Sequence, residues 1–507
     1  MGLFSKIQEE FKKPKYFTQT DLNTPTGTLS LQRCDLGPND VWRYRRIRGV
    51  NLGSMFVLEP WLVQRPYRSS AGSHASDHDV VRGKNAQCIL EDHWDTFMSE
   101  DDWMWLAQRG INTVRIPIGY YHLAGQEPRV LDGTDFDGYG ACYAGAWQYI
   151  KNAIEAAGRH GMGVLIDLHA AAGGQNKDSH SGTSTGEVRM WSSQANLNST
   201  SIALQFLVRN LSVIPHCIGV ELLNEPANNN NLQGWYEKTM VCLRLISSDF
   251  PIYISDAWDL PWYAKLVGER PDFVVVDHHV YRTFTAADRQ KSGDEHAAIL
   301  RSETKAHLAE MSKISRGNLI IGEWSAALHP SSLRSDDAGE QDRQRRVFVQ
   351  AELEMFEEHT AGWFFWTYKK ETGWDAGWSM RNATKAEILP CTFGKKRNMK
   401  VVRDDNKKQT MLSQALEQHT RYWTERGGDY QFWRFEEGFA TGWEDAFLFI
   451  SFPHGTTASE LGFRGEWLKR RTARHAREDH EPSASNFHWQ FQHGWDEGHD
   501  AAMSVYG

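Results

Sequence analysis

IGVELLNE, residues 218–225, is an apolar run that ends in an asparagine and a glutamate and is followed by Pro226. It is short and does not alternate, which predicts a strand buried on both faces of a parallel sheet. Seven similar runs occur, at residues 47–53, 113–118, 163–169, 251–257, 273–281, 318–324 and 362–368. Helix-sized segments separate them, such as 100–110 and 146–161, each ending in a glycine that suits a helix C-cap. Eight such strands in succession predict an α/β protein, a (β/α)8 barrel rather than an open sheet.

Polar and ionisable residues gather at the C-terminal ends of these runs. Barrel enzymes place their chemistry at that end of the strands. Any one of these residues alone would be an ordinary cap or loop residue, but together they indicate a site. They are Arg115, Asp167, His169, Asn224, Glu225, His279, Tyr281, Glu323 and Trp366.

Two of these residues suit glycosidic bond cleavage. The reaction needs a proton for the leaving oxygen and stabilisation of an oxocarbenium-like centre, and two carboxylic acids supply both. Glu225 and Glu323 end the fourth and seventh predicted strands, so a barrel would bring them into one cleft. We predict that Glu225 is the acid/base and Glu323 the nucleophile, with a spacing of about 5 Å as in retaining enzymes. Asn224 is placed to bind the sugar 2-hydroxyl.

Four further residues are expected to support this pair. Arg115 is expected to keep Glu323 ionised through its charge and a hydrogen bond. His279 and Tyr281 are two apart on one strand, hence on one face, and are expected to orient the carboxylates. Trp366 offers a platform for a sugar ring.

Several of these stretches resemble the strand-end motifs of glycoside hydrolase family 5. They are LLNEPA (222–227), IIGEW (320–324), VRIPIGYY (114–121), LIDLH (165–169), DHHVY (277–281) and GWFFWTYK (362–369). RGVNLGSMFVLEPWL (48–62) resembles the opening of the fungal exo-β-1,3-glucanase branch. The resemblance implies a glucan 1,3-β-glucosidase that retains configuration, with the same roles for Glu225 and Glu323. It also implies that His169 binds substrate and that Glu59 holds sugar hydroxyls at the non-reducing end.

Two segments depart from the pattern of that branch. The family opening usually reads NLGGW, and here residues 54–56 are Ser, Met and Phe. The loop after the third strand usually reads QNGF, and here residues 175–178 are Gln, Asn, Lys and Asp. The resemblance implies that Phe284 is the remaining half of an aromatic clamp on the second sugar. A β-glucosidase of another linkage or aglycone specificity therefore stays open as an alternative.

The chain is expected to have three parts. Residues 1–45 form an N-terminal extension, residues 46–415 the catalytic barrel, and residues 416–507 an aromatic-rich, mainly helical extension packed on the barrel. Two stretches in the last part, 433–446 and 489–502, keep small residues four apart, which predicts helix faces that let another backbone come close. These residues are Gly438, Gly442, Ala446, Gly494, Gly498 and Ala502. The polar tract 469–486 between them is expected to be a solvated loop or partly disordered.

The composition of the chain argues against some classes of binding partner. The net charge of −9 gives no basic surplus for nucleic acid, and no apolar run is long enough for a membrane span. Twenty-one tryptophans fit a carbohydrate ligand, although most are expected to pack in the core. We expect no cofactor and no metal. Six isolated cysteines and an N-terminus without a secretory pattern predict reduced thiols and a cytoplasmic location.

Two rival functions remain to be weighed. Ser184 stands in Gly182–Gly186, which matches the G-x-S-x-G motif of serine hydrolases. That motif requires a strand before it, and the preceding residues are polar and glycine-rich. The second rival is a non-catalytic barrel that binds glucan, which the presence of both Glu225 and Glu323 disfavours.

Overall fold

A computed structural model describes residues 36–397, 401–479 and 486–507. Residues 1–35 of the predicted N-terminal extension therefore lie outside the described residues. The chain divides into two compact units. One comprises Ile47–Gly394 with His454–Thr457, and the other comprises the described residues of Met1–Arg46, Lys395–Pro453 and Ala458–Gly507. In this division residues 395–415 belong to the second unit, whereas the sequence assigned them to the barrel.

The first unit is a closed barrel of eight parallel strands in sequential order, completed by pairing of the first strand with the last. This confirms the predicted fold. The strands are β1 (Ile47–Asn51), β2 (Thr113–Gly119), β3 (Gly163–Ala170), β4 (Cys217–Glu221), β5 (Ile252–Ser255), β6 (Val274–Arg282), β7 (Leu319–Leu328) and β8 (Gly362–Phe365). Most are buried along their whole length, as their unbroken apolar runs require.

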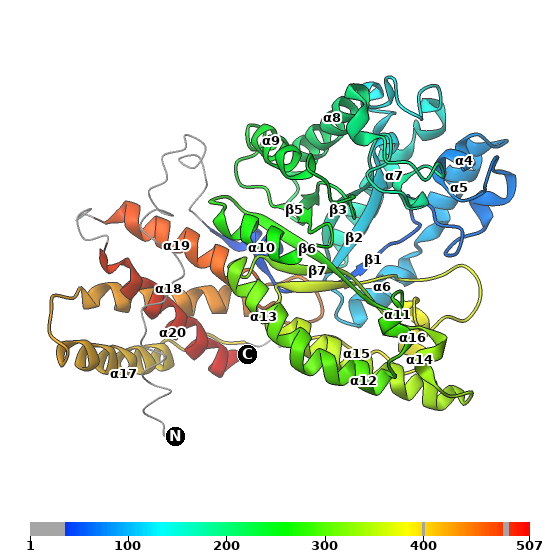
Figure 1. Ribbon diagram of the computed structural model, residues 1–507. Coiled ribbons are helices and arrows are strands. Elements are labelled where there is room, and N and C mark those ends of the chain that lie inside the picture. Colours follow the sequence, from blue (N-terminus) through cyan, green and yellow to red (C-terminus); the bar gives the residue numbers. More distant parts are fainter. Residues whose placement is uncertain (1–35, 398–400, 480–485) are drawn as a thin grey trace. The chain divides into compact units, whose positions relative to one another are not determined.

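Helices surround these strands (Figure 1). They are α4 (Asp77–Val81), α5 (Ala86–Phe97), α6 (Glu100–Gln108), α7 (Ala146–Arg159), α8 (Gln194–Leu211), α9 (Leu232–Arg244), α10 (Leu260–Glu269), α11 (Ala286–Arg289), α12 (Gly293–Ile299), α13 (Lys305–Ile314), α14 (Pro330–Leu333), α15 (Ala338–His359) and α16 (Met380–Lys385). The predicted helices 100–110 and 146–161 are α6 and α7. Gly110 and Gly161 follow them with φ of 78° and 76°, the left-handed conformation that glycine adopts most easily.

The second unit is helical. Its helices are α3 (Val41–Tyr44), α17 (Asp405–Thr424), α18 (Phe432–Ile450), α19 (Arg464–Glu478) and α20 (His488–Tyr506). The helical character of the C-terminal extension is confirmed, whereas its packing on the barrel stays a prediction.

The small faces of α18 and α20 pack directly on each other. A Cβ atom added to Gly442 would lie 2.1 Å from the carbonyl oxygen of Trp495, and one added to Gly498 would lie 2.0 Å from that of Phe439. Ala446 is fully buried in the same contact. Only small residues allow two helix backbones to approach this closely, so the predicted packing face is confirmed.

The prediction of a solvated loop at 469–486 was wrong for its first half. Residues up to Glu478 continue α19, and Lys469, Arg470 and Arg471 in it are buried. Their charges are compensated, because Lys469 and Arg470 pair with Glu466 and Arg471 pairs with Asp445. Such pairing makes burial of a polar segment possible. Residues 480–485 lie outside the described residues.

The two halves of the helical unit repeat one another. The imidazole of His419 on α17 stacks on Phe435 of α18, with ring centroids 4.1 Å apart. His475 on α19 stacks on Phe491 of α20 at 4.3 Å, and each of these residues follows its counterpart by 56 residues. The repeat noticed between α18 and α20 in the sequence therefore extends to the helix before each of them.

Five of the six cysteines fall within the described residues, and all five are free thiols: Cys88, Cys142, Cys217, Cys242 and Cys391. Cys34 lies outside the described residues. Across the described parts of the chain, no helix is both long enough and apolar enough to cross a membrane.

Candidate active site

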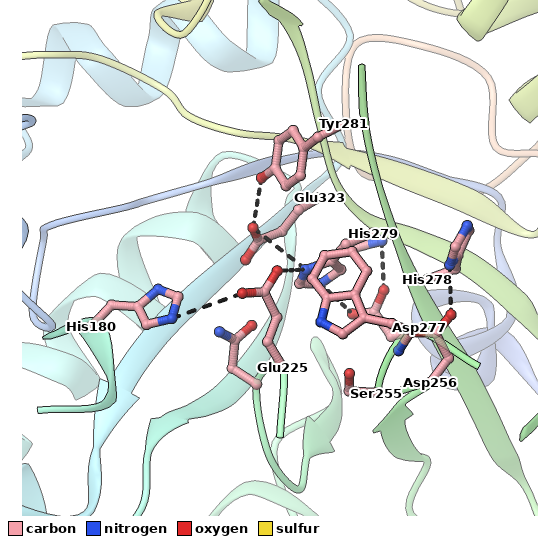
Figure 2. A network of polar contacts seen from close by, with 12 residues as sticks. His180, Glu225, Ser255, Asp256, Asp277, His278, His279, Tyr281 and Glu323 are labelled. Carbon is pink, nitrogen blue, oxygen red and sulfur yellow. Dashed lines mark hydrogen bonds and ion pairs between the residues drawn. The ribbon is translucent and has the colours of Figure 1, made fainter. Parts of the chain in front are cut away.

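The predicted site residues converge at the C-terminal ends of the barrel strands, with Glu225, His279, Tyr281 and Glu323 facing one another (Figure 2). Glu323 lies within β7, and His279 and Tyr281 lie within β6. Glu225 is different, because β4 ends at Glu221 and the chain turns before reaching it. Its φ of 42° is unusual for a residue other than glycine, and such strain is typical of functional positions.

His279 joins the two glutamates. Its Nδ1 lies 2.7 Å from Oε1 of Glu225 and 3.5 Å from Oε2 of Glu323. One oxygen of each carboxyl group lies within 4.8 Å of the other and of a His279 ring nitrogen. This matches the spacing of about 5–5.5 Å between carboxyl groups in retaining glycosidases and falls short of the range for inverting ones.

Glu323 is held at both oxygens. Nη1 of Arg115 donates to its Oε1 at 3.0 Å, and the hydroxyl of Tyr281 donates to its Oε2 at 2.6 Å. The carboxylate is buried, with 4% of the residue exposed. Two donors fix the direction of the carboxylate, as a nucleophile requires.

The protonation of the pair follows from these contacts. Burial raises the pKa of Glu323 to about 7, an increase that the charge of His279 opposes and that of Glu225 enhances. Burial would also raise the pKa of Glu225, but the hydrogen bond and charge of His279 outweigh it and lower the pKa to about 2. Burial works against a charged His279, but the Glu323 and Asp277 carboxylates raise its pKa well above the usual value. Between about pH 2 and pH 7 the pair therefore carries one proton.

Arg115 is the central cation of the site. Besides Glu323 it donates to Oδ1 of Asn51 at 3.0 Å, to Oδ1 of Asn224 at 2.9 Å and to Oε2 of Glu221 at 2.8 Å. Arg115 contacts Glu323 as expected and its charge lowers the pKa of that residue, but burial outweighs this effect, so its role in keeping Glu323 ionised stays a prediction. The side-chain oxygen of Asn224 accepts the hydrogen bond from Arg115. Its amide nitrogen therefore points toward His169, where it lies 3.4 Å from Nε2.

His169 and Trp366 form one wall of the site. Nδ1 of His169 lies 2.6 Å from Oδ2 of Asp167, and its ring is parallel to that of Trp366 at a centroid distance of 5.7 Å. Trp366 is 4% exposed. Most of its surface is therefore committed to protein contacts.

Glu59 and Phe284 occupy other parts of the rim. Burial raises the pKa of Glu59, whose Oε2 accepts a hydrogen bond from Nε1 of Trp61 at 2.8 Å. Phe284 is 62% exposed, and its ring is 5.7 Å from that of Tyr281 and 6.0 Å from that of Trp378. Phe284 is thus available to a ligand, next to the Tyr281 that holds Glu323.

The sequence interpretation missed several residues of the site. Nε2 of His180, on the loop after β3, lies 3.8 Å from Oε2 of Glu225 (Figure 2). Trp258, 60% exposed, lies with its ring 6.4 Å from that of His279. The loop conformation that brings both to the site leaves no periodic signal. Asp277, however, precedes His279 by two residues in one strand, which would have placed both on one face.

Metal binding and serine catalysis find little support here. Among the described residues, the groupings of potential metal ligands are Glu225–His279–Glu323 and Glu221–Asp277–His279. The Arg115 guanidinium contacts carboxylates of both groups, so its charge would oppose a metal cation. The hydroxyl of Ser184 donates to Oδ2 of Asp79 at 3.0 Å, and Asp79 is not a base of the kind that activates a serine hydrolase.

Two known protein families match most of the chain. Residues 76–372 match the family model of cellulase (glycosyl hydrolase family 5), and residues 404–506 match that of the glucan 1,3-beta-glucosidase 3 C-terminal domain. The chain is 28% identical over 489 residues to an uncharacterized glycosyl hydrolase of Saccharomyces cerevisiae, covering 92% of each chain. It is 29% identical over 452 residues to glucan 1,3-beta-glucosidase 3 of Schizosaccharomyces pombe, covering 86% of this chain and 92% of that one.

A solved structure shows the same fold. Rutinosidase from Aspergillus niger is 18% identical, with a TM-score of 0.54 over 68% of this chain and 98% of that one. The family model spans more than half of the 507 residues and includes both Glu225 and Glu323. The chain is a glycoside hydrolase and belongs to glycosyl hydrolase family 5.

Proposed function

We propose that the protein is a glucan 1,3-β-glucosidase that acts by double displacement, with Glu225 as acid/base and Glu323 as nucleophile. The observation that carries the proposal is that one oxygen of each carboxyl group lies within 4.8 Å of the other and that both groups approach Nδ1 of His279. The name of the Schizosaccharomyces pombe relative supports the β-1,3-glucan substrate.

In the first step Glu225 delivers a proton to the glycosidic oxygen while Glu323 attacks the anomeric carbon. The bond to the leaving sugar breaks, and a glycosyl ester of Glu323 forms. Arg115 and Tyr281, which fix both oxygens of Glu323, keep its carboxylate aimed during this attack. In the second step Glu225 takes a proton from water, which attacks the same carbon and releases a sugar of retained configuration.

The proton has to be on Glu225 for the first step, whereas the contacts of the empty site favour it on Glu323. Both states belong to the singly protonated pair, so they differ only in the position of one proton. We propose that substrate binding displaces His180 from Glu225, whose Oε2 lies 3.8 Å from Nε2 of His180. The electrostatic effect of His180 lowers the pKa of Glu225, so its displacement would favour the protonated form of Glu225.

Product analysis tests the proposed function. β-1,3-, β-1,4- and β-1,6-linked gluco-oligosaccharides and a panel of p-nitrophenyl glycosides are incubated with the protein, and the anomer first released is identified by NMR. We expect β-glucose as the first product and the fastest release from β-1,3-linked chains. A preference for another linkage would replace the substrate, and first release of the α-anomer would overturn the mechanism.

A further inference from the structure

A second layer of charged side chains lies inside the barrel, next to the catalytic pair. Arg115, Asp167, Glu221 and Asp277 are each fully buried. If all were ionised, three carboxylates would surround one guanidinium without access to water. Such an excess of buried charge is costly, and a buried acid relieves it by binding a proton.

The hydrogen bonds show where a proton is missing. Glu221 accepts from Nε of Arg115 through Oε2, and its Oε1 receives no hydrogen bond. Asp277 accepts the backbone N–H of Gly322 through Oδ1 at 2.6 Å, and its Oδ2 receives none. One ligand atom each of Glu221, Asp277 and His279 lie within 4.8 Å of one another. Two neighbouring acceptors in the buried interior therefore receive no hydrogen bond, since Nε2 of His279, 3.7 Å from Oδ2 of Asp277, is too distant to donate one.

We propose that Glu221 and Asp277 share one proton, so that a carboxylic acid and a carboxylate form a buried acid pair beneath the catalytic glutamates. One proton then turns an unsatisfied acceptor into a donor and satisfies the other acceptor, which removes two desolvation penalties. Burial raises the pKa of Glu221 well above its usual value, and the charges of Asp277 and Asp167 add to this against the opposing effect of Arg115.

The other groups that face Glu221 and Asp277 do not compensate the charges of these two carboxyl groups. Asp167 on β3 is already paired, with Oδ2 3.1 Å from Arg115 and 2.6 Å from His169. Tyr253 on β5 contributes a buried hydroxyl, and burial raises its pKa above the usual value, so it stays neutral. Glu225 and Glu323 are engaged by His279, Arg115 and Tyr281.

The acid pair connects the supports of both catalytic glutamates. Through Glu221 it holds Arg115, which donates to Glu323 and Asn224. Through Asp277, whose Oδ2 lies 3.7 Å from Nε2 of His279, it provides a counter-charge to the ring that contacts Glu225. Glu221 and Asp277 are thus positioning residues. Their link to catalysis rests on the roles proposed for Glu225 and Glu323.

Three variants test the shared proton through the pH dependence of kcat/KM. In Glu221→Gln the amide takes the place of the acid, and in Asp277→Asn the amide donates to an ionised Glu221. Each single variant keeps one negative charge, so we expect both to retain the wild-type alkaline limb. The double variant keeps none, and we expect its alkaline limb to shift to lower pH by about one unit, because loss of a nearby negative charge favours ionisation of the catalytic pair.

Two ionised carboxylates would give a different pattern, with a shift in each single variant and about twice that shift in the double variant. That pattern would overturn the inference. Asp272→Asn serves as the control, since Asp272 is a buried acid paired with Arg244 and Arg270 outside the site. We expect it to lower the melting temperature without moving either limb.

Infrared difference spectra supply a readout that does not depend on catalysis. At neutral pH the wild type is expected to show the carbonyl band of a protonated carboxyl group that is absent from Glu221→Gln. An unchanged band would overturn the inference, as would a melting temperature of the wild type that falls on removal of metal ions by a chelator. Inactivity of the wild type on every glycoside would instead contradict the proposed function and leave the infrared test decisive for the acid pair.

Discussion

The barrel and the helical unit both bury charged side chains, but they balance them differently. In the helical unit several buried ions are paired one to one. Asp445 accepts from Arg471 and from the indole N–H groups of Trp467 and Trp495, each at 2.8 Å, and Arg434 pairs with Asp479. In the barrel, five carboxyl groups lie around Arg115 and His279, namely Asp167, Glu221, Glu225, Asp277 and Glu323.

This difference in charge balance indicates which buried charges stabilise the fold and which take part in catalysis. In a buried pair of one cation and one anion, each charge stabilises the other, so neither group tends to gain or lose a proton. Removing one partner leaves the other as an uncompensated buried charge. An unbalanced cluster shifts pKa values and holds mobile protons, which is what acid–base catalysis needs. We therefore expect removal of Glu225 or Glu323 to reduce or abolish activity, and removal of a paired carboxylate in the helical unit to reduce stability.

The largest effect is expected for Glu323→Gly. Turnover of every glycoside should be lost, because no other carboxylate is placed to attack the anomeric carbon. Azide should fill the gap and attack the anomeric carbon of an activated aryl β-glucoside, so that the bond to the aryl oxygen breaks and a glycosyl azide of inverted configuration forms. The melting temperature should stay close to that of the wild type, because the pair carries a single negative charge and Glu225 keeps that charge in the variant. A marked loss of stability would contradict the comparison.

For Glu225→Ala we expect the rate on gluco-oligosaccharides to fall by about 10²–10⁴-fold, the usual contribution of a general acid. An aryl glucoside with a good leaving group needs little protonation, so its first step should survive while release of the glycosyl enzyme slows. Azide needs no base and should rescue that second step with retained configuration. Azide products of the opposite configurations in the two glutamate variants would reverse our assignment.

Asp445→Ala should destabilise the helical unit by about 3–5 kcal/mol, because Arg471 and two indole N–H groups lose their acceptor in a buried place. Denaturant unfolding measures the effect. Glu444→Ala is the matched control, since the adjacent side chain is 37% exposed in its ion pairs with Arg403 and Lys408. Such pairs contribute about 0–1 kcal/mol. Equal losses in both variants would show that burial of the pair is not what matters.

Gly442→Leu tests packing without charge. The added side chain would meet the backbone of α20, so we expect a loss of roughly 1–3 kcal/mol or more from overpacking. Gly234→Leu is the control, because an added Cβ on this glycine of α9 has no atom within 4 Å. Melting of Gly442→Leu at the wild-type temperature would show that α18 and α20 do not pack closely in solution.

The smallest expected effect is the decrease of kcat/KM on the alkaline side of its pH profile. Glu323 has a raised pKa, so the pair keeps its single proton below that value and loses it as the pH rises through about 7. Activity requires that proton, and kcat/KM should therefore fall above about pH 7 and be maintained through mildly acidic pH, where Glu225, with a pKa of about 2, does not bind a second proton. Rising activity from pH 7 to pH 9 would contradict this assignment.

Much of the barrel was predictable because buried parallel strands leave unbroken apolar runs, and the rule that chemistry lies at strand ends identified Arg115, His279 and Glu323. The acid pair was missed because Glu221 and Asp277 are inside the runs, where a charged residue has to be explained by partners on other strands. The first half of 469–486 was mispredicted for the same reason. Asp445 lies 26 residues before Arg471, and that pairing is invisible to local composition.

The barrel unit includes a segment that is synthesised long after its last strand. Its last strand ends at Phe365, yet His454–Thr457 belongs to the same unit, and the hydroxyl of Thr456 donates to the carbonyl of Ala107. A ribosome that adds about 5–20 residues per second would deliver this segment several seconds after the strands are complete. During that time the eight strands would lack this segment, although helices α17 and α18 would already have been synthesised. An expression clone ending at Gly394 would thus yield a barrel lacking one of its own pieces.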